Sequence, residues 1–397
     1  MTIAEARSRI PTQRNDFWHY APLDELSERV ARSVAPSGGV PTLVSPSLID
    51  AMTCGPGPRL VFVNGVPVAG LSTLENLPDG VRCGIAGADQ IERTHAAALT
   101  VDDGLRFAEP IQLVHLTAPD EAGTHLVQSR ARTTIELGDD AQLNVVEIHG
   151  SVDGPMSSTL TKASTTIRLG ERAELAHHRL QSDAPGATHI GHTDIRQGPA
   201  SVLRMTSVTV GGDITRNAIE VHLGAPDART ELMGIDVAVD DQRHDTVVSV
   251  QHGASRCASS QRFTGVVDDR SRGSFSGEII VAPGTVGTDA HQSSRNLVLD
   301  PNAEADTRPW LRILADDVRC THGATVGRLD DDALHYLRSR GIPIATARSM
   351  LVDAFLHDIT DSIKHEMVRL HVEAMVASAT SGAAAHGADS VPPGLDS

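Results

Sequence analysis

Short runs of β-branched and aliphatic residues alternate with Gly, Asp, Asn and Pro between about residues 100 and 320. The runs include TTIEL, LNVVEI, TTIRL, VLRMTSVTV, TVVSV, EIIVA and NLVLD. No amphipathic helix of normal length separates these runs, which argues against an alternating strand and helix architecture. The pattern therefore predicts a mainly β core, which we bound at residues 99–326.

A repeat lies inside this core. IELGDDAQL at 135–143 aligns with IRLGERAEL at 167–175, an offset of 32 residues. Looser copies begin at Val221 (VHLGAPDARTEL) and at Leu297 (LVLDPNAEADT). Each copy reads as a strand, a tight turn, a small Ala and a second strand. This recurrence predicts a β-solenoid in which each coil stacks on the next. An ordinary β-sandwich is the alternative, because its strands also come at short spacing.

The N-terminal part, residues 1–98, predicts mixed structure. Hydrophobic residues four apart in LSERVARSV predict a helix within residues 12–35, with Asp24 as its N-cap. The aromatic cluster RNDFWHYAPL at 14–23 is interpreted as a packing anchor for this helix. RLVFVNGVPV predicts a hairpin that turns at Asn64-Gly65.

Helical periodicity returns after the β core. LDDDALHYLRSRG places three aspartates at a helix start and Gly341 just past its end, and Pro343 suits the start of a second helix. These features predict a helical domain over residues 327–377. The small residues of SATSGAAAHGADSVPPGLDS predict a disordered tail over residues 378–397.

Composition narrows the class of partner. The 397 residues carry a formal net charge of −17 and only 3% aromatic side chains, which disfavours binding to nucleic acid or anionic lipid. No apolar stretch approaches the roughly 20 residues of a membrane span, and the start lacks the apolar core of a secretory signal. The four cysteines form no CxxC pair, which indicates reduced thiols. We therefore expect a cytoplasmic protein.

Common catalytic motifs are missing from the sequence. It has no phosphate-binding loop, no dinucleotide fingerprint after a strand, no nucleophile elbow and no HExxH. In DDVRCTHGATVG, Cys320 and His322 are two apart, so on a strand they would share one face. Thiolate and imidazole suit iron or iron-sulfur species, but two ligands would need a second chain to complete a site. A buried cysteine beside a surface histidine is the alternative.

Other histidines cluster in the β core, at His177-His178, His189, His192 and His291. A distributed metal relay is one interpretation of this cluster. We interpret most of these histidines instead as solvated side chains in polar β-turns.

The segment 276–342 resembles the SufB/SufD family of iron-sulfur cluster assembly proteins. TDAHQSSRNLVL, ADDVRCTHGATVG and YLRSRGI carry the resemblance, with RNDFWHYAPL and LVFVNG nearer the start. Within the family the chain is most similar to SufD, because SufB-type proteins carry an acidic residue beside the histidine of the CTHGATVG segment. The resemblance implies a right-handed parallel β-helix core with a helical N-terminal region and a C-terminal helical domain.

The resemblance also implies partners and roles. It implies pairing with a SufB-like paralogue and docking of a SufC-like ATPase, with no nucleotide bound by this chain. His322, and secondarily Cys320, would face the paralogue where an iron or nascent iron-sulfur cluster is held transiently. Leu337, Arg338 and Arg340 lie in the region that would dock the ATPase.

Three functions follow as hypotheses. The first is a noncatalytic scaffold subunit of the SUF assembly complex. The second is a β-helix enzyme acting on polysaccharides through paired carboxylates, against which the scarcity of aromatic residues argues. The third is a SufB-like homodimer that acts without a distinct partner.

Overall fold

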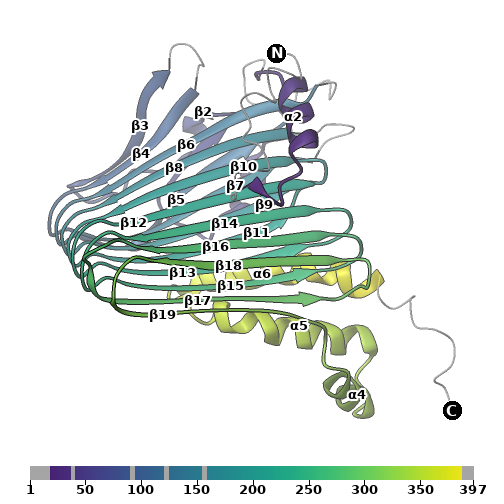
Figure 1. The fold of residues 1–397 in the computed structure, drawn as a ribbon. Helices are drawn as coiled ribbons and strands as arrows, with labels where there is room; N and C mark the ends of the chain where they lie inside the picture. The colour runs from purple at the N-terminus through teal and green to yellow at the C-terminus, as the bar shows by residue number, and fades with distance from the viewer. Residues whose placement is uncertain (1–17, 37–40, 90–93, 120–124, 154–158, 387–397) are drawn as a thin grey trace.

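A parallel β-solenoid forms the centre of the molecule (Figure 1). The computed structural model describes residues 18–36, 41–89, 94–119, 125–153 and 159–386. From β4 onward, successive strands alternate between two facing sheets, so each coil adds one strand to each sheet. Apart from the hairpins β1/β2 and β3/β4, the described strand pairs are parallel, which confirms the solenoid over the β-sandwich.

The two sheets run the length of the solenoid. Sheet 1 contains, in spatial order, β19 (Asp317–Gly327), β17 (Val286–Val298), β15 (Ala258–Val267), β13 (Arg229–Ala238), β11 (Val202–Gly211), β9 (Glu174–Asp183), β7 (Gln142–Ser151), β5 (Arg106–Thr117), β1 (Arg59–Val63) and β2 (Val66–Pro67). Sheet 2 contains β18 (Glu304–Ile313), β16 (Arg272–Val281), β14 (Arg243–His252), β12 (Ile214–Leu223), β10 (Thr188–Gln197), β8 (Thr159–Leu169), β6 (Val127–Leu137), β4 (Thr94–Val101) and β3 (Val81–Asp89).

The repeat offset of 32 residues is the pairing register of the first coils. Ile135 on β6 pairs with Ile167 on β8, so the two aligned copies are stacked neighbours. The copy at Val221 turns the same corner, from β12 in sheet 2 to β13 in sheet 1. The copy at Leu297 is not in the same phase, because it leads from β17 in sheet 1 to β18 in sheet 2. Both corners need similar tight turns, so their sequences look alike.

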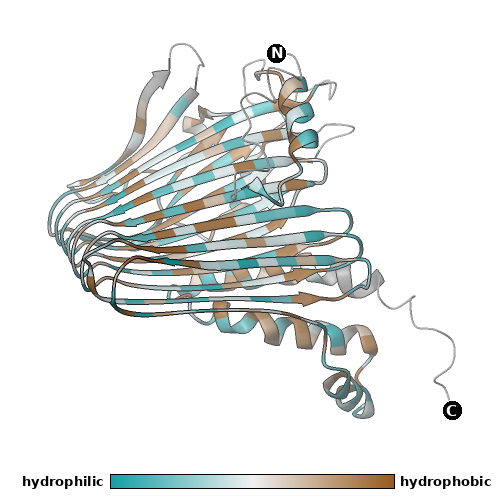
Figure 2. Ribbon diagram, viewed as in Figure 1, coloured by the Kyte–Doolittle hydropathy of each residue, from teal (hydrophilic) through white to brown (hydrophobic). Residues whose placement is uncertain are grey.

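Aliphatic ladders fill much of the interior. One ladder in sheet 2 follows the strand register through Leu99, Ile135, Ile167, Ile195, Val221, Val250 and Ile279. All of these side chains are fully buried. Figure 2 shows hydrophobic residues at matching positions on successive strands. Stacking of identical or similar side chains lets each coil bury its neighbour's apolar surface.

One corner of the solenoid repeats a left-handed backbone position. The residues with positive φ there are Asp140, Arg172, Ala200, Asp227 and Arg256. Each donates its backbone N–H to a carbonyl of the following coil, for example Asp140 to Glu171 and Arg172 to Pro199. Asp and Asn tolerate this conformation better than most residues, and the coil-to-coil hydrogen bonds hold the others in it.

The N-terminal helices lie on both sheets. They are α2 (Leu23–Arg32), α3 (Pro46–Met52) and the short η2 (Ala69–Leu71). Asp24 is not the N-cap of α2, because the helix starts earlier: Pro22 occupies the cap and Asp24 lies in the first turn. Trp18 packs with Leu26 against Ile214 of sheet 2, which confirms its role as a packing anchor. Residues 12–17 of the predicted helix lie outside the described residues.

The predicted hairpin is confirmed. β1 and β2 pair antiparallel around Asn64 and Gly65, whose φ angles are 53° and 78°. Two positive φ values are what a two-residue hairpin turn requires, and Asn-Gly is the sequence that adopts them most readily.

Three helices follow the last strand: α4 (Asp331–Ser339), α5 (Ile344–Thr360) and α6 (Glu366–His386). The Asp330 side chain caps α4, and Gly341 beyond its end has a φ of 83°, as the sequence predicted. α5 and α6 cover the outer face of sheet 1 (Figure 1). α6 was not predicted: it continues through residues 378–386, which the sequence assigned to a disordered tail.

The composition of α6 explains why residues 378–386 are helical. Its small residues are mostly Ala, a strong helix former, and Val368, Val372 and Val376 recur four apart and are buried against sheet 1. Residues 387–397 lie outside the described residues. Within the described part of the chain, none of the helices is both long enough and apolar enough to cross a membrane.

Candidate functional site at the open end of the solenoid

Cys320 and His322 lie on β19, the last strand of sheet 1. β19 pairs with β17, where Cys320 is in register with Ala290 and His322 with Gln292. Ala290 and Gln292 are buried and face the interior between the sheets. Neighbours in a parallel ladder share a face, so the thiol and the imidazole project together on the interior side, as their spacing predicted.

Each of the two side chains ends a ladder that runs through the solenoid. The ladder that ends at Cys320 is Leu143, Leu175, Leu203, Thr230, Ser259 and Ala290. The ladder that ends at His322 is Val145, His177, Met205, Leu232, Gln261 and Gln292. The solenoid therefore fixes the direction of both side chains through its whole length, although no further coil covers them.

The two side chains differ in exposure. Cys320 is half-buried and packs against the buried cluster of Ile279, Val281 and Ala290. His322 is exposed. Burial, with a smaller contribution from the carboxylate of Asp289, raises the pKa of the Cys320 thiol. The thiol is therefore protonated at neutral pH in the isolated chain, and only a nearby cation would favour the thiolate that binds metals.

This end of the solenoid is open. β19 and β18 are the last strands of their sheets, so each presents one backbone edge with no described strand beside it. Ile313, Leu314 and Val326 at this end are exposed apolar residues, and Val326 is 50% exposed. Uncovered strand edges that carry apolar side chains are typical of surfaces that pair with another chain.

The predicted docking residues lie elsewhere, on and just after α4. Leu337 is half-buried, whereas Arg338 and Arg340 are exposed. The Arg340 guanidinium lies 4.9 Å from the centre of the Tyr336 ring and also donates to the Tyr336 hydroxyl at 3.1 Å. Figure 1 shows α4 beyond the end of α5, away from the sheets. α4 contains no buried residue, so its surface is available to a partner.

A buried polar cluster lies inside the solenoid, and the sequence reasoning missed it. Its members are His115, Glu147, His149, His177, Arg179, Gln181, Asp183 and His189. Glu147 accepts hydrogen bonds from Thr165 at 2.8 Å and from His177 at 3.1 Å. Arg179 lies beside Glu147 in the register of β7 and β9. We call these eight residues the interior polar cluster.

Burial governs the charge of the interior polar cluster. It lowers the pKa of His115 to about 3 and of His149 to about 4, so both are neutral at physiological pH. Burial alone would raise the pKa of Glu147, but hydrogen bonds from His149 and His177 outweigh it and hold this pKa well below its usual range. Burial also lowers the pKa of Arg179 to about 10, which leaves it charged beside the carboxylate.

The sequence interpretation of the histidines is therefore wrong for three of them. His177, His178 and His189 are buried on strands, not solvated in turns. His192 and His291 are exposed, and they too lie on strands. The sequence contained one signal of this burial. Polar residues recur at every second position of the predicted strand, so they lie on one face of it, which is here the interior face.

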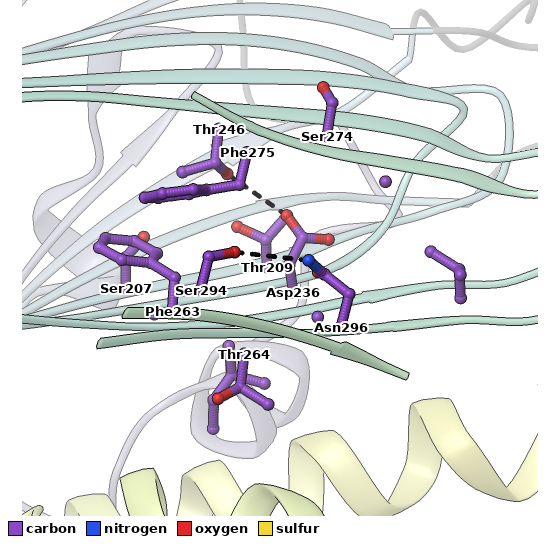
Figure 3. Close-up of a pocket in the computed structure, with 15 residues that line it drawn as sticks. Ser207, Thr209, Asp236, Thr246, Phe263, Thr264, Ser274, Phe275, Ser294 and Asn296 are labelled. Carbon is purple, nitrogen blue, oxygen red and sulfur yellow. Dashed lines mark hydrogen bonds between the residues drawn. The ribbon is translucent and has the colours of Figure 1, made fainter. Parts of the chain in front are cut away.

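A small cavity lies between the interior polar cluster and the open end (Figure 3). Its volume is about 30 Å³, room for about two water molecules. Asp236 and Thr246 reach each other across it, at 3.4 Å, and Ser294 and Asn296 line its side on β17. Phe263 and Phe275 close its apolar wall, with ring centres 4.7 Å apart.

The terminal strand sets what chemistry is possible. One thiol and one imidazole are two of the four ligands that an iron-sulfur cluster takes from protein, so this chain alone does not close such a site. Fold and site together define a β-solenoid whose open end carries one thiol and one imidazole on an uncovered terminal strand.

Comparison with known proteins identifies the family. Residues 120–355 match the model of the SufBD core domain, described as SUF system FeS cluster assembly. The match covers more than half of the chain, and the chain belongs to this family. It is similar to iron-sulfur cluster assembly protein SufD of Escherichia coli K12, with 30% identity over 95% of this chain and 91% of that protein.

Two further relatives show the same extent of similarity. A SufBD family protein of Synechocystis is 30% identical over 89% of this chain and 84% of its own length. A SufBD family protein of Mycobacterium leprae is 28% identical over 91% of this chain and 88% of its own length. The chain is therefore a SufD-like member of the SufBD family of iron-sulfur cluster assembly proteins.

Proposed function

We propose that this chain is a noncatalytic scaffold subunit of a SUF assembly complex. Its open solenoid end pairs with a SufB-like paralogue, and its C-terminal helical domain docks a SufC-like ATPase. Cys320 and His322 contribute ligands to iron or a nascent cluster held between the two solenoids. The iron-sulfur cluster is cargo of this assembly, and the chain itself binds no nucleotide.

The observation that carries the proposal is the pair of metal-binding side chains on an uncovered terminal strand. A second solenoid placed against β18 and β19 would cover Ile313, Leu314 and Val326 and bring its own ligands toward Cys320 and His322. Covering these strand edges removes unpaired backbone groups from water and adds further ligands in the same step. The paired chain would supply what the isolated site lacks.

The ATPase partner follows from a different observation. The sequence has no phosphate-binding loop, so energy from ATP would have to come from another chain. α4 offers an exposed surface with Tyr336, Arg338 and Arg340. α4 contacts α5, and α5 packs on β13 and β15 of sheet 1, so a pull on α4 would reach the solenoid through α5.

All four cysteines are unpaired, which suits a reducing compartment such as the cytoplasm.

Replacing His322 by Ala in the co-expressed complex tests the site. We expect assembly of the complex by size-exclusion chromatography but a severalfold loss of iron and sulfide per complex. Thr321→Ala is the matched control, because Thr321 is the preceding residue on the same strand and contacts His291 on the opposite face. Full retention of cluster by His322→Ala would refute the assignment, and equal loss in both variants would point to a disturbed strand.

The family membership favours cluster assembly over the polysaccharide-active alternative. The homodimer alternative would use the same open end, since two copies present the same strand edges. The mass of the purified chain, alone and with a SufB-like and a SufC-like protein, distinguishes the two. A homodimer that persists in the presence of the paralogue would contradict the proposed pairing.

A further inference from the structure

Four potential metal ligands meet on the outer face of sheet 2, far along the chain from Cys320 and His322. They are His192 and Asp194 on β10 and Glu220 and His222 on β12. Asp194 pairs with Glu220 in the strand register. His192 is two residues before Asp194 and His222 is two after Glu220, so all four side chains project from the same face. We call these four residues the outer-face cluster.

Three donor atoms of the outer-face cluster are close enough for one ion, and the fourth, on His192, lies near one of them. His222 Nε2 lies 3.3 Å from Asp194 Oδ2, and His192 Nδ1 lies 4.0 Å from Glu220 Oε1. One donor atom from each of Asp194, Glu220 and His222 lies within 4.8 Å of the others. Two ligands on a tetrahedral zinc ion with bonds of about 2.1 Å are separated by about 3.4 Å. Small side-chain rotations would bring the remaining donors to this separation.

Burial and charge also favour a cation. The side chains of Asp194 and His222 are 23% and 28% exposed, so the sheet holds them more firmly than free surface residues. Arg196 engages the other oxygen of Asp194, Oδ1, at 3.2 Å, which leaves Oδ2 directed at His222. Two carboxylates and one guanidinium leave one negative charge for an incoming cation. Within the described chain, no other group of three such side chains comes this close together.

We propose that the outer-face cluster binds one divalent first-row transition metal ion. Two imidazole nitrogens and two carboxylate oxygens form a donor set that suits Zn²⁺ or Fe²⁺ and does not suit Mg²⁺ or Ca²⁺, which prefer oxygen alone. Binding displaces the contact between His222 and Asp194, and each turns its donor atom to the ion. The site needs no second chain, unlike the pair on β19.

The test uses Zn²⁺ and Co²⁺ as probes on the full chain carrying Cys320→Ser and His322→Ala. This background removes the ligands of the proposed function, so failure of one proposal does not decide the other. Equilibrium dialysis gives stoichiometry and affinity, and the visible absorption of bound Co²⁺ reports its geometry. His222→Ala removes one ligand, and Asp194→Asn removes another while keeping the side chain's shape.

His357→Ala is the matched control. His357 Nε2 on α5 lies 2.9 Å from Oδ2 of Asp361, the residue that follows the helix, and both are exposed, but no third donor among the described residues joins this pair. We expect one Zn²⁺ per chain in the background variant and in His357→Ala, and at least a tenfold weaker affinity in His222→Ala and Asp194→Asn, since loss of even an indirect partner costs about 10- to 100-fold. No binding by the background variant, or equal affinity in all variants, would overturn the proposal.

Discussion

His252 makes the solenoid sensitive to acid. It is the last residue of β14, it is fully buried, and its Nε2 lies 2.8 Å from the Ser259 hydroxyl. Burial lowers the pKa of this imidazole to about 4. Unlike the histidines of the interior polar cluster, it has no charged partner that contributes to the shift, so its effect on stability can be worked out from burial alone.

The magnitude follows from the two pKa values. In the unfolded chain the pKa of His252 returns to about 6.5, so between pH 6.5 and about 4 the unfolded state binds a proton that the folded state excludes. The contribution of neutral His252 to stability is therefore fully present above pH 6.5 and is lost as the pH drops toward 4. Each pH unit in this window costs about 1.4 kcal/mol. At pH 5 this one histidine destabilises the fold by about 2 kcal/mol relative to pH 8.

His252→Gln removes the titration but keeps a group that can hydrogen-bond Ser259. We expect the difference in unfolding free energy between pH 8 and pH 5, from urea titrations followed by circular dichroism, to be about 2 kcal/mol smaller in the variant. His335→Gln, at an exposed histidine of α4, is the control for removing an imidazole and should leave the difference unchanged. The same pH difference in His252→Gln and the parent protein would refute the reasoning.

Two further predictions test the core and the docking surface. Ile167→Ala leaves a cavity in the fully buried aliphatic ladder and should cost about 2 to 5 kcal/mol in urea unfolding at pH 8, whereas Ile167→Val should cost about 1 kcal/mol; equal losses would contradict ladder packing. Arg338→Glu combined with Arg340→Glu reverses two exposed charges and should weaken ATPase binding by about tenfold, or about 1.4 kcal/mol, in a titration. Unchanged ATPase affinity would exclude α4 from the docking surface.

The solenoid could be predicted because its period is visible in the first coils. The 32-residue offset between IELGDDAQL and IRLGERAEL is the spacing of Ile135 and Ile167 in neighbouring strands. The next rung, Ile195, comes after a shorter interval, because the corner loops change length from coil to coil. A fixed period therefore identified the fold but not the phase, because the copy at Leu297 lies at the opposite corner from the other three.

The site was predictable in part for a similar reason. Spacing two apart on a strand was enough to place Cys320 and His322 on one face. Which face they share depends on pairing with β17, which the sequence did not reveal. The interior polar cluster was missed because histidine and glutamate usually indicate surface, and here Glu147 and His177 satisfy each other inside. Local sequence does not reveal a buried partner 30 residues away.

A bulge at the start of β17 sets the register in which the pair on β19 joins the ladders of the solenoid. Val286 pairs with Asp317 and Thr288 pairs with Val318, so Gly287 is skipped in the strand register, and its N–H donates instead to Asp317 Oδ2 at 3.0 Å. If the register ran on without this extra residue, Cys320 would lie beside Asp289 and would point to the outer face with it, because a slip of one residue turns every side chain over. Gly287 has a φ of 69°, a conformation that glycine adopts without a Cβ penalty. The direction of Cys320 and His322 is thus held by the ladders of the solenoid together with this bulge, and both lie outside the CTHGATVG segment.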